Sequence, residues 1–156
     1  MLPPHERSWA AAAPLPKTKK GNEYLLTILD MASRFPEATP LRNIRTPTIV
    51  EALTLFFTRY GLPREVQSDR GSNCTSSLFQ AVMHELGITQ VTSSAYHPES
   101  QGAIERFHRP LKDMVQAYSA QFPTEWDVAR PFLTFAARDS VCESTGFTPF
   151  QLVYGQ

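Results

Sequence analysis

The chain has 156 residues, 42% of them hydrophobic, which is enough for one globular domain with its own core. Fifteen basic and fifteen acidic residues give a formal net charge of zero, so bulk charge excludes any general argument for nucleic-acid or membrane binding. The two cysteines, Cys74 and Cys142, are too few for a disulfide framework or a zinc knuckle, so we expect a reducing compartment.

No stretch of the sequence has the composition of a signal peptide or of a membrane span. The first twenty residues lack an apolar run of the required length, and no later run approaches membrane-spanning length. We therefore expect an intracellular protein, in the nucleus or the cytoplasm, with no membrane partner.

The first predicted elements are two strands joined by a polar turn. They run from Tyr24 to Asp30 and from about Arg34 to Pro40, because both stretches hold strand-forming residues bounded by turn residues. A helix follows, in which we expect Thr46 as the N-cap, Pro47 in the first helical position and Gly61 as the C-terminal stop.

Strands and helices alternate in the next part of the chain. A short strand from Arg64 to Ser68 ends at Asp69, a helix begins near Ser77 and stops at Gly87, and a strand follows from Ile88 to Thr92. This alternation after an antiparallel pair indicates an α/β fold, with a mixed sheet covered by helices.

A carboxylate follows the last of these strands. Residues 93–102 are predicted to form a polar loop, and the helix that begins near Gln101 carries Glu105 in its first turn. Asp69 stands at the C-terminal end of a strand, where α/β sheets usually hold their chemistry. The count from 69 to 105 leaves 35 residues between the two acids.

Asp69 and Glu105 are the candidate metal ligands. Mg²⁺ prefers hard oxygen ligands and commonly binds through one or two carboxylates, and a pair of such ions can activate a hydroxyl and stabilise a leaving phosphodiester oxygen. The alternative is that both acids are solvated surface charges, and spacing alone favours that alternative.

Four stretches of the chain resemble the catalytic core of the integrases of retroviruses and long-terminal-repeat retrotransposons of the Ty3/gypsy type. They lie in family order over about residues 14–155: PLPKTKKGNEYLLTILDMASRFPEATPL, GLPREVQSDRGSNCTS, ELGITQVTSSAYHPESQGAIERFHRPLK and PFLTFAARDSVCESTGFTPFQLVYG. The resemblance implies a ribonuclease-H-like fold, a five-stranded mixed sheet flanked by helices, and an Asp-Asp-Glu (DDE) triad that binds Mg²⁺ or Mn²⁺. Asp69 and Glu105 match the last two acids of that triad.

The resemblance also implies contacts with DNA. Lys112 occupies a position where the family has a lysine that contacts the DNA ends of the element. Arg106 and Arg109 lie on roughly the same side of the helix and could meet phosphates, although an ordinary solvated helix face is an equal alternative. His97 resembles a loop histidine that shapes the loop or contacts substrate. The expected partners are DNA, as element ends and target, and a second copy of the chain.

Two departures from the family pattern argue against catalysis. Ala10 stands where the first catalytic Asp is expected and Ala13 where a Gly is expected. Alanine is depleted in strands, so residues 1–13 are predicted to form a degenerate or poorly ordered segment, and residues 14–156 the core-like domain. Pro110 falls inside the predicted helix, where it removes a backbone bond, costs about 3 kcal/mol or more and is expected to kink the element that carries Glu105.

Three readings follow from this sequence. The first, which we favour, is an integrase-core-like domain from a retrotransposon-derived gene that has lost catalysis, with or without a remaining role in binding nucleic acid or protein. In the second, the domain is an active transferase in which Glu6 or Asp30 supplies the missing carboxylate. The third is an unrelated α/β binding module, and the four ordered stretches argue against it.

Overall fold

The computed structural model describes residues 6–11, 14–68, 76–92, 98–143 and 145–155. For residues 6–11, 68, 92, 98–108 and 110 the description is limited to the backbone. Asp69 and His97 lie outside the described residues, and so do the side chains of Glu105 and Arg106.

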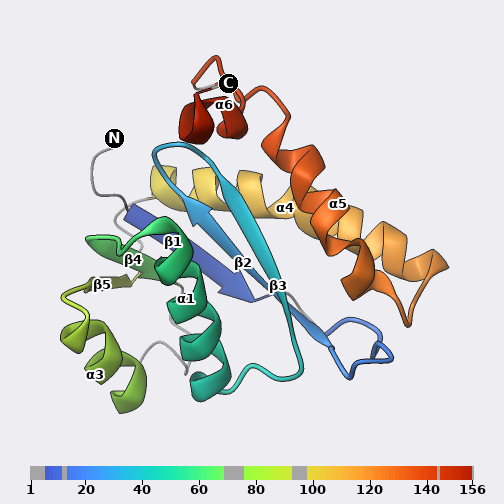
Figure 1. Cartoon of the computed structure of the whole chain (residues 1–156), viewed down its shortest axis with the longest axis horizontal. Coiled ribbons are helices and arrows are strands. Elements are labelled where there is room, and N and C mark those ends of the chain that lie inside the picture. Colours follow the sequence, from blue (N-terminus) through green and yellow to red (C-terminus); the bar gives the residue numbers. More distant parts are fainter. Residues whose placement is uncertain (1–5, 12–13, 69–75, 93–97, 144, 156) are drawn as a thin grey trace.

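A five-stranded sheet forms the centre of the molecule (Figure 1). Its strands lie in the order β3-β2-β1-β4-β5. Their bounds are Glu6–Ala11 for β1, Tyr24–Asp30 for β2, Pro36–Leu41 for β3, Glu65–Ser68 for β4 and Thr89–Thr92 for β5. β1 is antiparallel to β2 and parallel to β4, so the predicted mixed α/β sheet is confirmed.

β1 differs from the prediction for the N-terminal segment. The alanine run predicts a degenerate or poorly ordered stretch over residues 1–13, yet Glu6–Ala11 form the central strand of the sheet. The backbone of β1 pairs with β2 from Arg7 to Ala11 and with β4 from Glu6 to Ser8. Ladder hydrogen bonds require no particular side chain, so two neighbouring strands can hold a strand of weak intrinsic preference.

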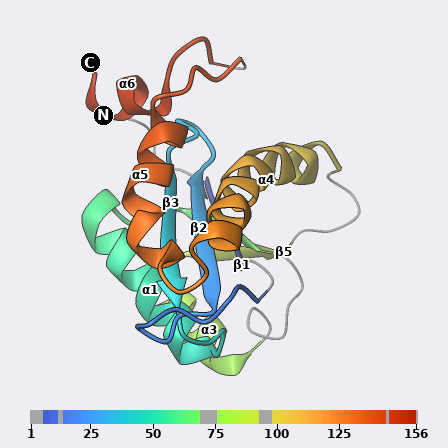
Figure 2. The same cartoon turned by 90° about the vertical axis from the view of Figure 1, so that its right-hand side faces the viewer.

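Helices cover both faces of the sheet (Figure 2). The helices are α1 (Thr46–Tyr60), α3 (Ser77–Glu85), α4 (Pro98–Gln121), α5 (Trp126–Arg138) and α6 (Pro149–Tyr154). α1 and α3 pack on a core that includes Leu26 and Ile28 of β2. α4 and α5 pack on a second core that includes Leu25 of the same strand. Alternate residues of β2 therefore face opposite layers, as the period of a strand requires.

Helix ends follow the predicted capping chemistry with one shift. Gly61 ends α1 with a φ of 90° and donates its backbone N–H to the carbonyl of Phe57 at 2.8 Å. The prediction of Thr46 as N-cap is wrong by one residue, because Arg45 is the N-cap. Asn43 Oδ1 accepts from the Arg45 N–H at 3.0 Å, so the orphaned donors at this end are met from a residue further upstream.

No element is predicted from the sequence for the region of helices α5 and α6. α6 has a capping box in which the Thr148 side chain accepts from the Gln151 backbone and the Gln151 side chain accepts from Thr148, with Pro149 in the first position. These residues were available in the sequence as a start signal. Within the described residues, no helix combines the length and apolarity needed to cross a membrane.

Candidate active site

The parallel strands β1 and β4 direct positions 10 and 69 to the same end of the sheet, the end where both strands finish. Ser8 of β1 pairs with Gln67 of β4. Ala10 follows two residues after Ser8, and Asp69 follows two residues after Gln67. Asp69 itself lies outside the described residues, so its approach to position 10 stays a prediction.

Position 10 belongs to the face of the sheet that α4 covers. Ala10 pairs with Thr27 of β2, and residues that pair directly share a face of a ladder. Thr27 is 4% exposed, and it lies two residues from Leu25, which packs in the core beneath α4 and α5. By register, position 10 therefore belongs to the face of the sheet on which α4 packs.

Helix α4 begins earlier than predicted. The polar stretch up to Gly102 is predicted as loop, but α4 starts at Pro98, so Glu105 lies seven residues, about two turns, into the helix and not in its first turn. Proline suits the first turn because its missing N–H would be unbonded there. One glycine costs only about 1 kcal/mol, so Gly102 does not stop the helix.

The helix also continues past Pro110 to Gln121. Leu111 and Val115 follow the proline, and each is 1% exposed in the core between α4 and the sheet. Burial of two such side chains contributes about 3–6 kcal/mol, enough to offset the cost of an interior proline. Tertiary packing therefore explains why the chain stays helical where its local preference is poor.

Lys112 lies on the same side of α4 as Glu105. Glu105 and Lys112 are seven residues apart, which places them within about 20° of each other around the axis. Lys112 is half-buried and Arg109 is exposed. The backbone of Arg106 lies in the same helix, and His97 lies outside the described residues.

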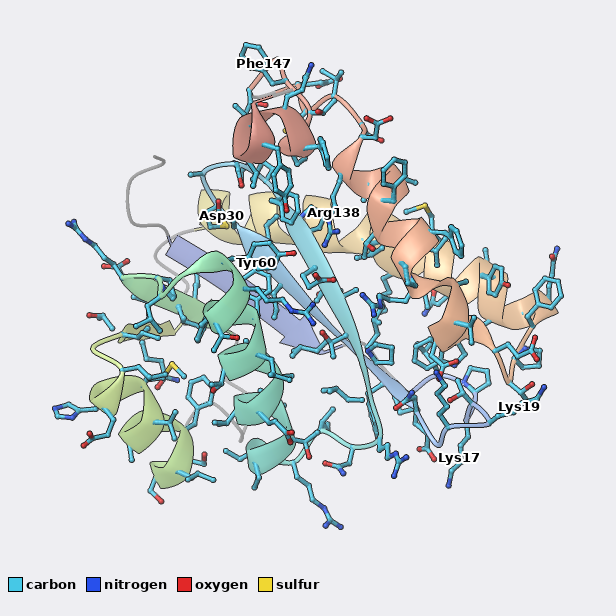
Figure 3. All side chains as sticks on the ribbon, in the orientation of Figure 1. Lys17, Lys19, Asp30, Tyr60, Arg138 and Phe147 are labelled. Carbon is cyan, nitrogen blue, oxygen red and sulfur yellow. The ribbon has the colours of Figure 1, made fainter. Side chains whose placement is uncertain are left out.

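Asp30 is poorly placed to replace the missing carboxylate. It pairs with Arg7, three residues before Ala10, which is about 10 Å along the strand. Its Oδ2 accepts from Ser33 Oγ at 2.6 Å and from the Ser33 N–H at 3.4 Å, and the residue is 4% exposed. Figure 3 shows Asp30 at the β2–β3 turn, far from Lys17 and Lys19 in the connection after β1. Asp30 therefore closes a turn.

Glu6 is also poorly placed to replace the missing carboxylate, because it lies at the N-terminal end of β1. Its backbone pairs with Glu65 at the start of β4, four residues before Ala10 and about 13 Å along the strand. Within the described part of the chain, no group of three or more His, Cys, Asp or Glu residues lies close enough to hold a metal ion.

Sequence reasoning missed a buried aspartate that fastens the connection after β1. Thr18 Oγ1 and Asn22 Nδ2 each donate to Asp127 Oδ2 at 2.8 Å, and Trp126 Nε1 donates to the carbonyl of Pro16 at 2.6 Å. Burial would raise the pKa of Asp127, but the hydrogen bonds from Asn22 and Thr18 and the charge of Lys20 outweigh it, so the pKa is lowered. The contacts join residues more than a hundred positions apart, which no local pattern reveals.

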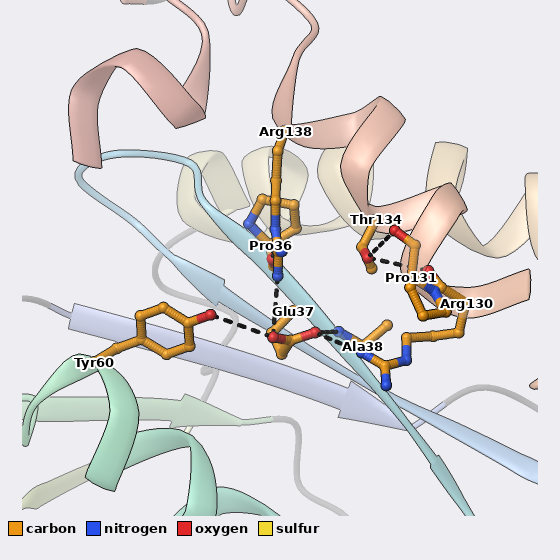
Figure 4. Close-up of polar contacts among 8 residues, drawn as sticks. All are labelled: Pro36, Glu37, Ala38, Tyr60, Arg130, Pro131, Thr134 and Arg138. Atoms are coloured by element: carbon orange, nitrogen blue, oxygen red, sulfur yellow. Dashed lines mark hydrogen bonds and ion pairs between the residues drawn. The ribbon is translucent and has the colours of Figure 1, made fainter. Parts of the chain in front are cut away.

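A second missed residue is Glu37, which is 7% exposed on β3. Its carboxylate forms ion pairs with Arg138 Nη2 at 3.0 Å and Arg130 Nη1 at 3.4 Å, both from α5 (Figure 4). Tyr60 Oη of α1 donates to Glu37 Oε2 at 3.5 Å. Burial, and then the charge of Glu37, raises the pKa of Tyr60 above its ordinary value. A charged residue at an inward position of a strand was the available signal.

Comparisons with known proteins identify the family of this chain. The model of the family described as Integrase core domain matches residues 12–98, more than half of the chain. The match includes Asp69 but neither position 10 nor Glu105.

Relatives by sequence are retroviral and transposon polyproteins. The chain is 28% identical over 144 residues to the retrovirus-related Pol polyprotein from transposon 412 of Drosophila melanogaster, covering 92% of this chain and 12% of that protein. It is 31% identical over 137 residues to the Gag-Pol polyprotein of feline leukemia virus, covering 86% of this chain and 8% of that protein. The chain therefore spans about a tenth of the length of these curated relatives.

Solved structures share the fold. The catalytic core domain of BIV integrase superposes with a TM-score of 0.77 at 24% identity, covering 97% of this chain and 94% of that one. The HTLV-2 integrase catalytic core domain, solved in complex with magnesium in trimeric and dimeric forms, gives TM-scores of 0.76 and 0.75 at 20% identity, covering 99% of each chain. This chain belongs to the integrase core domain family and has a core of retroviral or retrotransposon origin.

Proposed function

We propose that this chain is an integrase-core-like domain whose polynucleotidyl transfer is impaired by the loss of the first metal-binding carboxylate. One observation carries the proposal. Ala10 lies in the central strand, on the face covered by α4. It follows Ser8 by two residues, as Asp69 follows Gln67, and Ser8 pairs with Gln67. A methyl group at that position cannot ligate a cation.

The remaining donor set fits a two-ion centre poorly. Asp69 and Glu105 offer two carboxylates where the family resemblance implies three, and the charge of two divalent ions needs hard oxygen ligands. The two carboxylates would hold a single Mg²⁺ or Mn²⁺ weakly. An active enzyme with a substitute acid is the weaker reading, because Glu6 and Asp30 pair near the opposite end of β1.

A domain that has lost catalysis can still bind DNA. Arg109 is exposed on α4 and Lys112 is half-buried on the same side of the helix. Cations in this arrangement suit phosphate contacts, which need no metal centre. Arg106 and His97 are proposed to join them, on the strength of the family resemblance alone.

Self-association is the second proposed property. α5 exposes Val128, Phe132 and Phe135 at 58%, 75% and 60%, along one side of the helix at intervals of four and three residues. Exposed apolar rows of this kind mark interaction surfaces. A second copy is the proposed occupant, since the HTLV-2 core of the same fold forms dimers and trimers. The row at positions 128, 132 and 135 is called the α5 outer face below.

Calorimetric titration with Mg²⁺ and Mn²⁺ tests the metal site. We expect weak or undetectable binding by the unmodified chain and tighter binding by Ala10→Asp, because the third carboxylate restores a ligand. In the second arm, the double variant Ala10→Asp with Pro110→Thr is assayed with Mn²⁺ on a pre-nicked branched DNA. Cleavage by the double variant that is abolished by Glu105→Gln supports the proposal.

The unmodified chain is the control for both arms. It should show no strand transfer and no processing of DNA ends. Robust cleavage by the unmodified chain that depends on Asp30 or Glu6 would overturn the proposal in favour of the substitute-acid reading. Equal metal affinity of the unmodified chain and Ala10→Asp would remove position 10 from the site.

A further inference from the structure

β3 is an edge strand whose outward backbone nitrogens are blocked by its own sequence and whose Pro36 carbonyl is bonded to α5. The carbonyl of Pro36 accepts from Arg138 Nε at 2.9 Å, and the N–H of Ala38 donates to Glu37 Oε1 at 3.0 Å. Alternate residues of a strand direct their backbone groups to the same side, so Pro40 shares that side with Pro36 and Ala38. Two of these three outward nitrogens are prolines, which carry no hydrogen, and the third is bonded to Glu37. Closure of this kind protects edge strands from pairing with other chains.

The helix that covers this edge has an unusual distribution of side chains. Its inward row contains Arg130, Thr134 and Arg138, four residues apart, with Thr134 only 1% exposed. Its outward row is the apolar α5 outer face. Soluble helices normally bury the apolar row, so α5 is held on the sheet edge partly by charge rather than by apolar packing alone.

Glu37 is the group that these inward charges share. The side chains of Arg138 and Arg130 are 19% and 32% exposed, so both guanidinium groups have lost much of their water. Arg138 also lies over the ring of Phe35, 4.3 Å from its centroid. The Nε of Arg130 is buried with no hydrogen-bond partner among the described residues, which makes its pair with Glu37 the more important.

The two halves of α5 are fastened by different means. At the N-terminal end, Trp126 is fully buried and Asp127 is bonded to Thr18 and Asn22. At the C-terminal end, Arg138 contacts Glu37 and the carbonyl of Pro36 (Figure 4), and Leu133 packs against the core that includes Ala38. Loss of Glu37 therefore releases the C-terminal half first.

We propose that Glu37 is a positioning residue that holds the C-terminal half of α5 against the edge of β3 through Arg130 and Arg138, and thereby sets the orientation of the α5 outer face. Removal of the carboxylate charge leaves two partly buried guanidinium groups without a counter-charge, and that is more costly than the loss of a contact. The turn of α5 around Arg138 then separates from β3 while Trp126 keeps the first turn in place.

Backbone amide exchange, followed residue by residue at a concentration where the chain is monomeric, tests this role. Glu37→Gln is nearly isosteric and keeps an oxygen that can accept from Ala38, but it loses the charge. We expect exchange at residues 133–138 to rise at least about tenfold relative to residues 24–30 of the sheet, with a smaller rise at the first turn of α5. Glu51→Gln, at an exposed carboxylate on α1, is the matched control and should change neither.

A purely global loss of stability raises exchange in β2 and α5 together, and that result would overturn the proposal, as would unchanged exchange in α5. Arg138→Lys provides a milder variant in case Glu37→Gln does not fold. It keeps the charge but loses the paired contacts to Glu37 and Pro36, so the same local rise is expected at a smaller size. Because the experiment needs neither metal nor a dimer, its failure is separate from failure of the proposed function.

Discussion

Ala10 and Asp127 show how single side chains decide different properties of this domain. Alanine at position 10 has no side-chain oxygen to offer a cation, and the backbone of its strand pairs with β2 from Arg7 to Ala11 and with β4 from Glu6 to Ser8. Asp127 is 9% exposed and remains charged, because two donors satisfy one of its oxygens. Removal of the Asp127 carboxylate would leave buried donors without an acceptor.

Asp127 should make stability depend on pH. Its pKa is lowered from the ordinary value of 3.8, so the folded state binds a proton less readily than the unfolded state. The stabilisation is therefore fully present above about pH 4 and is lost as the pH falls through the lowered pKa. We expect Asp127→Asn to reduce the free energy of unfolding at pH 7 by roughly 1–3 kcal/mol, measured by urea denaturation.

The exposed Asp113 on α4 provides the control, since Asp113→Asn should leave stability within about 0.5 kcal/mol of the unmodified chain. The difference between Asp127→Asn and the unmodified chain should shrink between pH 7 and pH 3, because the unfolded state, whose carboxyl group has the ordinary pKa, binds a proton before the folded state does. A difference of equal size at pH 3 and pH 7 would show that charge plays no part.

Among the elements, α4 and α5 depart most from what local pattern implies. α4 stays helical through Gly102 and Pro110 because its later turns bury Leu111 and Val115. α5 turns its apolar row outward, where Phe132 is 75% exposed. Burial of Leu111 and Val115 explains α4, and the proposed contact with a second copy would cover the apolar row of α5.

The α5 outer face should control self-association. Phe132→Ser removes the most exposed of its large apolar side chains, and we expect the dissociation constant of the dimer, measured by sedimentation equilibrium, to rise at least about tenfold. Leu78→Ser on α3, where the leucine is 45% exposed, should leave it unchanged. Equal weakening by both substitutions would indicate non-specific apolar contact, and no change in Phe132→Ser would place the interface elsewhere.

At the scale of the whole molecule, β1 joins two halves that would otherwise not share a sheet. β2 and β3 form its antiparallel side, and β4 and β5 form its parallel side. Each half joins the sheet through hydrogen bonds to β1. The continuity of the five-stranded sheet therefore depends on the strand with the weakest intrinsic strand preference. The N-terminal segment is therefore part of the folding unit.

Deletion of residues 1–13 should abolish cooperative folding, because it removes β1, which among the strands of the described residues is the one that pairs with both β2 and β4. Circular dichroism and thermal unfolding would show loss of the transition. Deletion of residues 1–5, which end before β1, should leave the transition in place. A cooperative transition in the shorter chain of residues 14–156 would instead support the domain boundary that the sequence predicts.

Local signals in the sequence determined much of this protein. The apolar stretch within Tyr24–Asp30, the serine cap at position 76, the stop at Gly61 and the absence of an aspartate at position 10 can all be read from neighbouring residues. Interactions within a few residues are enough to decide such features. Tertiary structure alone decided that Glu6–Ala11 form the central strand and that Glu37 and Asp127 are buried with their partners. The hydrogen bonds from Thr18 to Asp127 and from Arg138 to Glu37 join residues about a hundred positions apart, and the energy that stabilises them exists only once the sheet and helices have packed.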